Sequence, residues 1–299
     1  MGAPLFLDRG GHRTWLKWHR ARRRAGDPVF SRTRILEGLQ LGASVEVDLV
    51  IHGGHGFALL HDFLLDNETT GHGPARQNPP EALRELHRRS EDGTPLSDTV
   101  MLLEDLCALL AESTPAPGAL LQLDVKEDLA ALDELTVTNF ARAVEPVSET
   151  MIVSGGDAAA IAALAGATPG LAIGHDPCQD DKVARLRATG DFAGFIAEGL
   201  AEAPAASMIY LAHEIIASAD VAGFDIIGAC HAAGKRVDAW TIQRVNQSSV
   251  ARCERLIALG VDQITTDDPE GLAAALSRMT SSRQRGTLSR QHRRHDGLL

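Results

Sequence analysis

The chain has 299 residues, a formal net charge of −11, and a composition that is 44% hydrophobic and 4% aromatic. This length fits one large domain or two small ones, and an α/β barrel commonly uses about 250 residues. The composition is ordinary for a soluble globular protein with a sizeable core, and the acidic charge argues against generic nucleic-acid binding.

Apolar runs in this chain are far shorter than a membrane span, so we expect no transmembrane helix and no stable membrane insertion. The first residues lack the basic and long apolar regions of a signal peptide. The four cysteines show no CxxC spacing, which favours small buried side chains in a reducing compartment. We therefore expect a cytoplasmic protein.

Arginines crowd the first 34 residues and recur six times over Arg278–Arg294. The N-terminal cluster could meet an anionic substrate or a lipid surface, but solvated arginine-rich loops are common. We interpret all of these arginines except Arg20 as solvated surface.

The first predicted strand is Thr14–Arg20, in which Lys17 and His19 share one face. A basic loop follows. The next segment, Arg32–Leu41, predicts a helix that ends at Gly42.

The stretch Val45–Asp62 reads VEVDLVIHGGHGFALLHD and predicts a second strand followed by a hairpin return. Because Glu46 and Asp48 stand two positions apart, both carboxylates project from one face of the strand. The Gly-rich turn His52–Gly56 then leads back to His61. Paired acids are costly unless a metal or a proton relieves them, so this hairpin indicates a metal site; a solvated amphipathic strand is the alternative.

After a turn-rich loop, short apolar segments alternate with helical ones along the rest of the chain. Counting the first two, the predicted strands lie near positions 17, 47, 122, 152, 172, 209, 239 and 264. The predicted helices are Glu81–Arg89, Val100–Leu110, Leu129–Ala143, Ala158–Ala165, Asp181–Ala188, Val221–Ala233, Ser248–Leu259 and Gly271–Met279. Eight strands separated by helices predict a (β/α)₈ barrel with an extra β-hairpin after strand two. A doubly wound open sheet is the alternative, although no GxGxxG follows an early strand.

Ionisable and polar residues recur where these predicted strands end, which is where barrel enzymes carry their chemistry. His19-Arg20 ends the first strand, Glu46-Val-Asp48 begins 27 residues after His19, and His61-Asp62 follows after another 15. Later motifs are Asp124-Val-Lys126, the segment Asp238–Ile242 (DAWTI), and Gly260–Pro269 (GVDQITTDDP).

Together these motifs resemble the glycerophosphodiester phosphodiesterase family, whose barrel is of the phosphatidylinositol phospholipase C-like type. The match runs from about residue 15 to residue 275. The family has Gly where Ala21 stands, a Pro-Glu-Asn-Thr loop that is missing here, and Glu where Asp124 stands. An Asp-x-Lys also occurs in the related sphingomyelinase-D-like phospholipases.

The resemblance implies hydrolysis of glycerophosphodiesters to glycerol 3-phosphate and an alcohol. It implies His19 and His61 as the general acid and base, with attack by the substrate's own glycerol hydroxyl through a cyclic phosphate. Glu46, Asp48 and Asp124 would bind one divalent cation, Mg²⁺ or Ca²⁺. Arg20, Lys126 and Trp240 would contact the substrate.

Two other functions stay open: a phospholipase-D-like enzyme acting on lysolipids or sphingolipids, and a non-catalytic barrel that binds phosphorylated ligands. The expected partner is a small-molecule phosphodiester, and a homo-oligomer stays open. We expect one phosphodiesterase domain over residues 14–279 and a disordered basic tail over residues 280–299.

Overall fold

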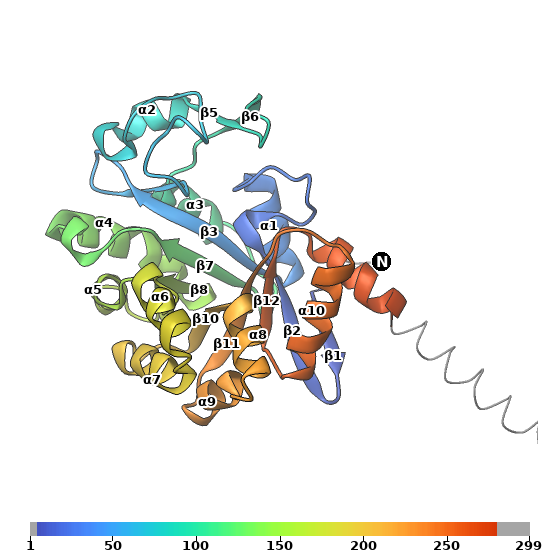
Figure 1. The fold of residues 1–299 in the computed structure, drawn as a ribbon. Coiled ribbons are helices and arrows are strands. Elements are labelled where there is room, and N and C mark those ends of the chain that lie inside the picture. Colours follow the sequence, from blue (N-terminus) through green and yellow to red (C-terminus); the bar gives the residue numbers. More distant parts are fainter. Residues whose placement is uncertain (1–4, 280–299) are drawn as a thin grey trace, which may run out of the picture.

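Eight parallel strands close into a ring in the computed structural model, which describes residues 5–279. Around the ring, each strand pairs with the next, and the last pairs again with the first (Figure 1). In ring order the strands are β2 (His12–Trp18), β3 (Ser44–Ile51), β7 (Leu120–Val125), β8 (Met151–Gly155), β9 (Ala172–His175), β10 (Met208–Ala212), β11 (Arg236–Ile242) and β12 (Gln263–Thr266). The predicted (β/α)₈ barrel and its eight strand positions are confirmed. The open-sheet alternative is wrong, because β2 and β12 leave no free edge between them.

Helices surround the barrel and cover its outer face (Figure 1). They are α1 (Arg32–Leu41), α2 (Pro80–Glu85), α3 (Leu103–Ala111), α4 (Glu134–Val144), α5 (Ala158–Gly166), α6 (Asp180–Thr189), α7 (Phe192–Glu202), α8 (His213–Val221), α9 (Ile226–Ala232), α10 (Gln247–Ala258) and a helix over 269–279. Outward-facing strand residues and inward-facing helix residues form two large apolar clusters between the layers. Gly42 ends α1 as predicted, because it adopts a left-handed φ of 86° that glycine tolerates.

Several predicted elements differ from the observed ones. The predicted helix Glu81–Arg89 ends at Glu85, and its last residues instead form β5 (His87–Arg89), which pairs with β6 (Pro95–Thr99). The predicted helix Val221–Ala233 starts late: α8 ends at Val221, and α9 begins only after a turn. The sequence analysis did not predict α7, α8, or β1 (Phe6–Arg9), which pairs antiparallel with β2 outside the ring.

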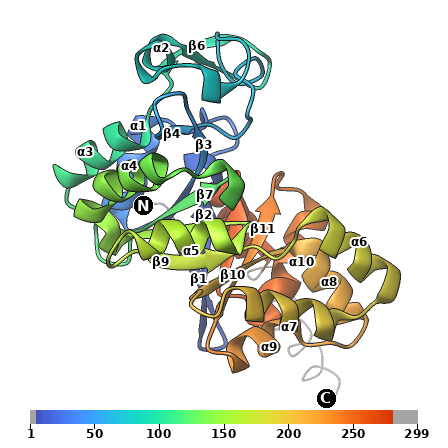
Figure 2. The ribbon, with the colours of Figure 1, turned by 90° about the vertical axis from the view of Figure 1, so that its left-hand side faces the viewer.

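The predicted hairpin after the second strand is confirmed: β4 (Phe57–Leu59) runs antiparallel to β3. The chain then builds an insertion, residues 60–100, that carries α2, β5 and β6. Figure 2 shows these elements standing together beyond the end of β3. The insertion has its own apolar cluster, which includes Leu60, Leu65 and Leu83 and packs on Val50 of β3.

The interior of the barrel is unusually polar. Lys17 is 1% exposed, and its Nζ lies 3.1 Å from Asp238 Oδ2 and 4.4 Å from the ring centroid of Tyr210. Gln263 and Thr265 also donate hydrogen bonds to Asp238, at 2.5 and 2.6 Å. A buried ion pair is therefore the centre of a hydrogen-bonded layer beneath the carboxyl ends of the strands.

Within residues 5–279 no single helix is long and apolar enough to cross a membrane, and α8 and α9 reach that length and composition only as a pair bent by 106°. The predicted tail, residues 280–299, lies outside the described residues. The domain boundaries and the oligomeric state stay predictions.

Replacement of Lys17 by Met tests the buried ion pair. Methionine keeps the aliphatic stem but leaves the Asp238 charge without its partner, so we expect the free energy of unfolding to fall by about 3–5 kcal/mol. Urea denaturation measures the change. Lys235→Met is the control, because Lys235 only donates to the Pro204 carbonyl near the surface; its expected cost is about 1 kcal/mol. An equally small loss for Lys17→Met would contradict this role.

Candidate active site

Three carboxylates meet on the adjacent strands β3 and β7. Asp48 and Asp124 are register partners in the parallel ladder, and Glu46 lies two residues before Asp48 on the same face. One oxygen from each of the three lies within 4.8 Å of the others. Asp48 is 1% exposed and Glu46 is 4% exposed. The strand pairing itself therefore forces three acids together in a buried place.

Two cations neutralise part of this charge. Lys126 Nζ lies 2.6 Å from Asp48 Oδ1 and 2.5 Å from Asp124 Oδ2. Arg20 Nε lies 3.1 Å from Asp48 Oδ2, and the Arg20 backbone N–H donates to Glu46 Oε2 at 2.6 Å. Lys126 and Arg20 thus contact the acids directly.

The pKa values of the acids diverge because the cations lie nearer to one of them. Burial, together with the charges of Asp48 and Asp124, raises the pKa of Glu46 well above its usual value. Burial also acts to raise the pKa of Asp48, but Lys126 and Arg20 outweigh it and hold that pKa below its usual range. Asp48 is therefore the ionised member of the pair, and Glu46 is the member that retains a proton most readily.

A hydrogen-bond chain from the barrel interior orients Asp124. Lys17 donates to Gln122 Oε1, the Gln122 amide donates to Ser154 Oγ at 2.8 Å, and Ser154 Oγ donates to Asp124 Oδ1 at 2.8 Å. Each member sits on the inward face of its strand. The polar layer below the site is thus connected to one of its carboxylates.

His19 lies immediately after β2, at the start of a short 3₁₀ turn, His19–Ala21. Its Nδ1 lies 2.5 Å from Asp267 Oδ1, which follows β12. Since a carboxylate accepts, Nδ1 donates and Nε2 is the basic nitrogen of the neutral ring. Arg20 and Ala21 have positive φ values of 51° and 60°, a strained conformation that turns the chain away from the strand.

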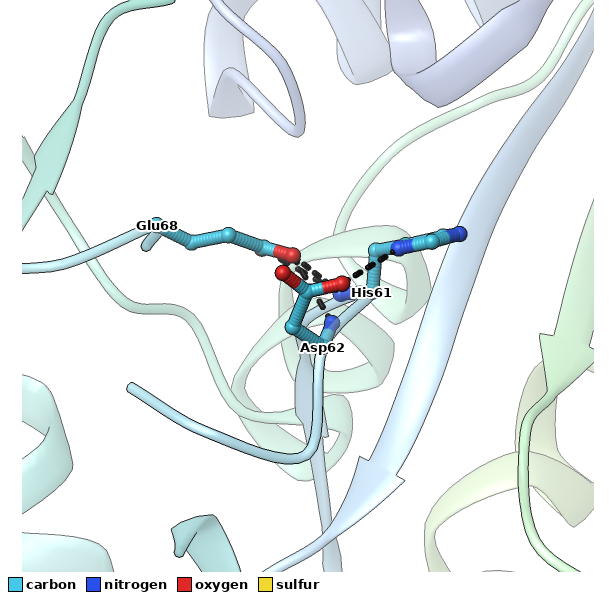
Figure 3. Close-up of side chains that lie close together, drawn as sticks. All are labelled: His61, Asp62 and Glu68. Carbon is cyan, nitrogen blue, oxygen red and sulfur yellow. Dashed lines mark hydrogen bonds and ion pairs between the residues drawn. The ribbon is translucent and has the colours of Figure 1, made fainter. Parts of the chain in front are cut away.

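His61 follows β4, and its Nδ1 lies 2.8 Å from Asp62 Oδ1, so its Nε2 is also the basic nitrogen. Figure 3 shows Glu68 facing the backbone nitrogens of His61 and Asp62, while the imidazole points away from Glu68. The two backbone N–H groups donate to Glu68 at 3.1 and 2.8 Å. Glu68 thereby fixes the backbone from which the imidazole projects.

Arg88 supports this arrangement from within the insertion. It is 1% exposed, donates to the Leu59 carbonyl at 2.8 Å and pairs with Glu68 Oε2 at 3.4 Å. Burial lowers the pKa of Arg88 to about 10, which keeps it charged at neutral pH. Its guanidinium also lies over the ring of Phe30, whose N–H donates to the Arg20 carbonyl. One buried arginine therefore connects the segments that carry His19 and His61.

All eight predicted site residues line one cavity of about 740 Å³ at the carboxyl ends of the strands. They are His19, Arg20, Glu46, Asp48, His61, Asp124, Lys126 and Trp240. Their roles stay predictions. Sequence reasoning assigned no supporting role to Gln122, Asp267, Glu68 or Arg88. Asp267 lies within the motif Gly260–Pro269, but nothing in that motif showed that it contacts His19.

The three-carboxylate cluster fits a divalent cation. Neither oxygen of Asp48 makes a hydrogen bond of regular geometry, although both are buried. Oxygen donors of this kind suit hard cations such as Mg²⁺ and Ca²⁺. The second acidic group, His61, Asp62 and Glu68, fits less well, because its carboxylates already accept hydrogen bonds from the backbone, His61 and Asn67.

Asp176 also lines the cavity, just after β9. Burial raises the pKa of Asp176 to about 7, even though the Cys178 N–H donates to its carboxylate at 2.8 Å. No sequence motif pointed to this residue.

The structure is similar to solved structures of glycerophosphodiester phosphodiesterases. A glycerophosphoryl diester phosphodiesterase from Parabacteroides distasonis matches with a TM-score of 0.60 and 17% identity, over 92% of this chain and 90% of that one. A glycerophosphodiester phosphodiesterase from Agrobacterium tumefaciens matches with a TM-score of 0.60 and 18% identity, over 87% of this chain and 99% of that one. An Oleispira antarctica phosphodiesterase in complex with the product sn-glycerol-3-phosphate matches with a TM-score of 0.61 and 19% identity, over 88% of this chain and 96% of that one.

At these identities the likeness establishes the fold, in agreement with the closed ring of eight strands. No protein-family model matches the sequence, and no curated protein matches it.

Replacement of Asp176 by Asn tests its burial. The folded chain keeps Asp176 protonated up to about pH 7, whereas an unfolded aspartate ionises near pH 3.9. The contribution of Asp176 to the free energy of unfolding therefore falls as pH rises between these values. We expect Asp176→Asn to gain about 2 kcal/mol relative to the wild type between pH 5 and pH 8. Urea denaturation in EDTA at a series of pH values measures this free energy. Replacement of the exposed Asp181 by Asn is the control. The same pH dependence of the free energy of unfolding in Asp176→Asn and in the wild type would contradict the raised pKa of Asp176.

Proposed function

We propose that this chain hydrolyses glycerophosphodiesters to glycerol 3-phosphate and an alcohol, with one divalent cation. The observation that carries the proposal is the pair His19 and His61, each with Nδ1 held by an aspartate, lining one cavity with the three-carboxylate cluster. The Oleispira antarctica phosphodiesterase, whose fold is the same, was solved with sn-glycerol-3-phosphate, and this supports the substrate class.

The two histidines account for the proton transfers that the reaction needs. One Nε2 takes a proton from the attacking hydroxyl, and the other Nε2 gives a proton to the departing alkoxide of the alcohol. Neither Nε2 makes a hydrogen bond within residues 5–279, so both are available to a substrate. Asp267 and Asp62 accept from Nδ1 and hold the rings in the tautomer that leaves Nε2 free for the substrate.

The remaining residues position the phosphodiester. Arg20 and Lys126 present their charges to Asp48 at the cavity wall, next to where non-bridging phosphoryl oxygens would lie. Trp240 lines the cavity and would pack against the glycerol or the alcohol. A cation held by Glu46, Asp48 and Asp124 would neutralise and polarise the phosphoryl oxygens.

Turnover of a panel of glycerophosphodiesters, with and without chelator, tests the function. We expect release of glycerol 3-phosphate with Mg²⁺ or Ca²⁺ and none with EDTA. We expect His19→Ala and His61→Ala each to lower kcat by about 10²–10⁴-fold, the usual contribution of general acid–base catalysis.

His231→Ala is the matched control, because His231 contacts Asp262 away from the cavity. Turnover of lysolipid micelles alone would favour the phospholipase-D-like alternative. Binding of glycerol 3-phosphate without any turnover would favour a non-catalytic barrel, and unchanged kcat in both cavity variants would refute the histidine roles.

Replacement of Glu68 by Ala tests the positioning of His61. Without the carboxylate, two backbone N–H groups and Arg88 lose their acceptor, and the imidazole loses its fixed position. We expect kcat to fall by about 10–100-fold with little change in KM. Steady-state kinetics measure both.

Glu68→Gln should recover part of the loss, because its amide oxygen still accepts a backbone N–H. Glu85→Ala, an exposed residue of α2, controls for damage to the insertion. A rise in KM at constant kcat would show that Glu68 does not act through His61.

A further inference from the structure

The cavity has two walls of different charge. The carboxylates lie on β3 and β7. In the eight-membered ring β10 lies four places from β3 and β11 lies four places from β7, so β10 and β11 are on the opposite side of the mouth. On that side, Arg244 follows β11 and Arg252 lies on α10, and both line the cavity. The positive charge of these two arginines thus faces the acids across the mouth.

These two arginines lack carboxylate partners within residues 5–279. Arg244 makes no hydrogen bond or ion pair there, and Arg252 contacts only the ring of His213, at 3.4 Å. Ten other arginines of the same region form ion pairs. The remaining arginines of this region that lack a carboxylate partner, such as Arg142, Arg187 and Arg236, do not line this cavity. In a chain with a net charge of −11, two unpaired arginines on one cavity wall indicate a place for an anion supplied from outside.

The cations on the acidic wall are already engaged. Arg20 and Lys126 lie against Asp48, so their charge is balanced by the protein. Glu214 lines the same cavity and lies 3.1 Å from His213 Nε2, but its side chain is 64% exposed. Arg244 also lines a smaller neighbouring cavity with Asp267 and Glu91, and both of these acids already pair with Arg22. A second anion is therefore better accommodated at Arg244 and Arg252 than elsewhere in the cavity.

We propose that Arg244 and Arg252 bind a second anionic group, a phosphate monoester or a carboxylate, on the alcohol part of the substrate. The proposal rests on the proposed function, since it places the scissile phosphodiester at the acidic wall. A cavity of about 740 Å³ has room for glycerol phosphate and a further polar group. Guanidinium groups bind phosphate and carboxylate oxygens in a bidentate manner. A cationic alcohol such as choline would meet repulsion at this wall.

Two matched pairs of substrates distinguish the two anions. Glycerophosphoinositol 4-phosphate differs from glycerophosphoinositol by one phosphate, and glycerophosphoserine differs from glycerophosphoethanolamine by one carboxylate. We expect kcat/KM to be about tenfold higher for the anionic member of at least one pair at low salt. The preference should shrink as ionic strength rises, because Arg244 is exposed.

Arg244→Gln and Arg252→Gln should each reduce this ratio severalfold, and the double variant should bring it close to one. Arg255→Gln is the control: Arg255 also lies on α10 but pairs with Asp220, so the ratio should stay at the wild-type value. Equal kcat/KM within both pairs, or a ratio that persists in the double variant, would overturn the proposal.

Binding without turnover separates this proposal from the proposed function. Calorimetric titration in EDTA compares the Kd of glycerophosphoinositol 4-phosphate with that of glycerophosphoinositol. A tighter Kd for the phosphorylated compound that is lost in the double variant would support the anion site even if nothing is hydrolysed. Hydrolysis of all four compounds without preference in either Kd or kcat/KM would support the phosphodiesterase activity and refute the anion site.

Discussion

Repulsion among Glu46, Asp48 and Asp124 is the constraint that organises this molecule. Parallel pairing of β3 and β7 places Asp48 beside Asp124, and the strand period places Glu46 on the same face, so the fold cannot separate the three acids. Buried carboxylates at this distance are stable only with compensating charge. Lys126 and Arg20 supply two positive charges against three carboxylates, and burial together with the two neighbouring acids raises the pKa of Glu46. That residual charge imbalance makes the cluster suited to a divalent cation.

Both histidine segments depend on residues that lie outside the barrel strands. The insertion brings Glu68 and Arg88 to the backbone at His61, and Arg88 reaches Phe30, which contacts the backbone of Arg20. Arg88 is buried, so its charge is stabilised only if these contacts persist. The insertion therefore supports both histidine segments, and its separate apolar cluster packs it against β3.

The sequence predicted the ring of strands because alternation and strand-end motifs are local. It also named eight candidate residues that the structure places along one cavity, since their spacing along the chain resembles that of a known family. It did not predict the contact between His19 and Asp267, which lie 248 positions apart and meet only when β12 closes against β2. It missed α7, where Gly194 and Gly199 weaken the helix signal that tertiary packing overrides. The sequence analysis placed Arg88 in a helix because the strand β5 forms only by pairing with β6, whose residues lie further along the chain.

Two residues that differ from the motifs of the resembled family, Ala21 and Asp124, are held by contacts with their neighbours. Ala21 adopts a φ of 60° that glycine would accept more easily, yet it is fully buried, and the Arg20 N–H beside it donates to Glu46. Such strain persists only where surrounding contacts over-determine the backbone. Asp124 has a shorter side chain than the glutamate at this place in the family that the sequence resembles, and Ser154 holds one of its oxygens while Lys126 holds the other. In both cases the carboxylate cluster stabilises the departure, because the hydrogen bonds that fix the backbone and the shortened side chain end on the acids themselves.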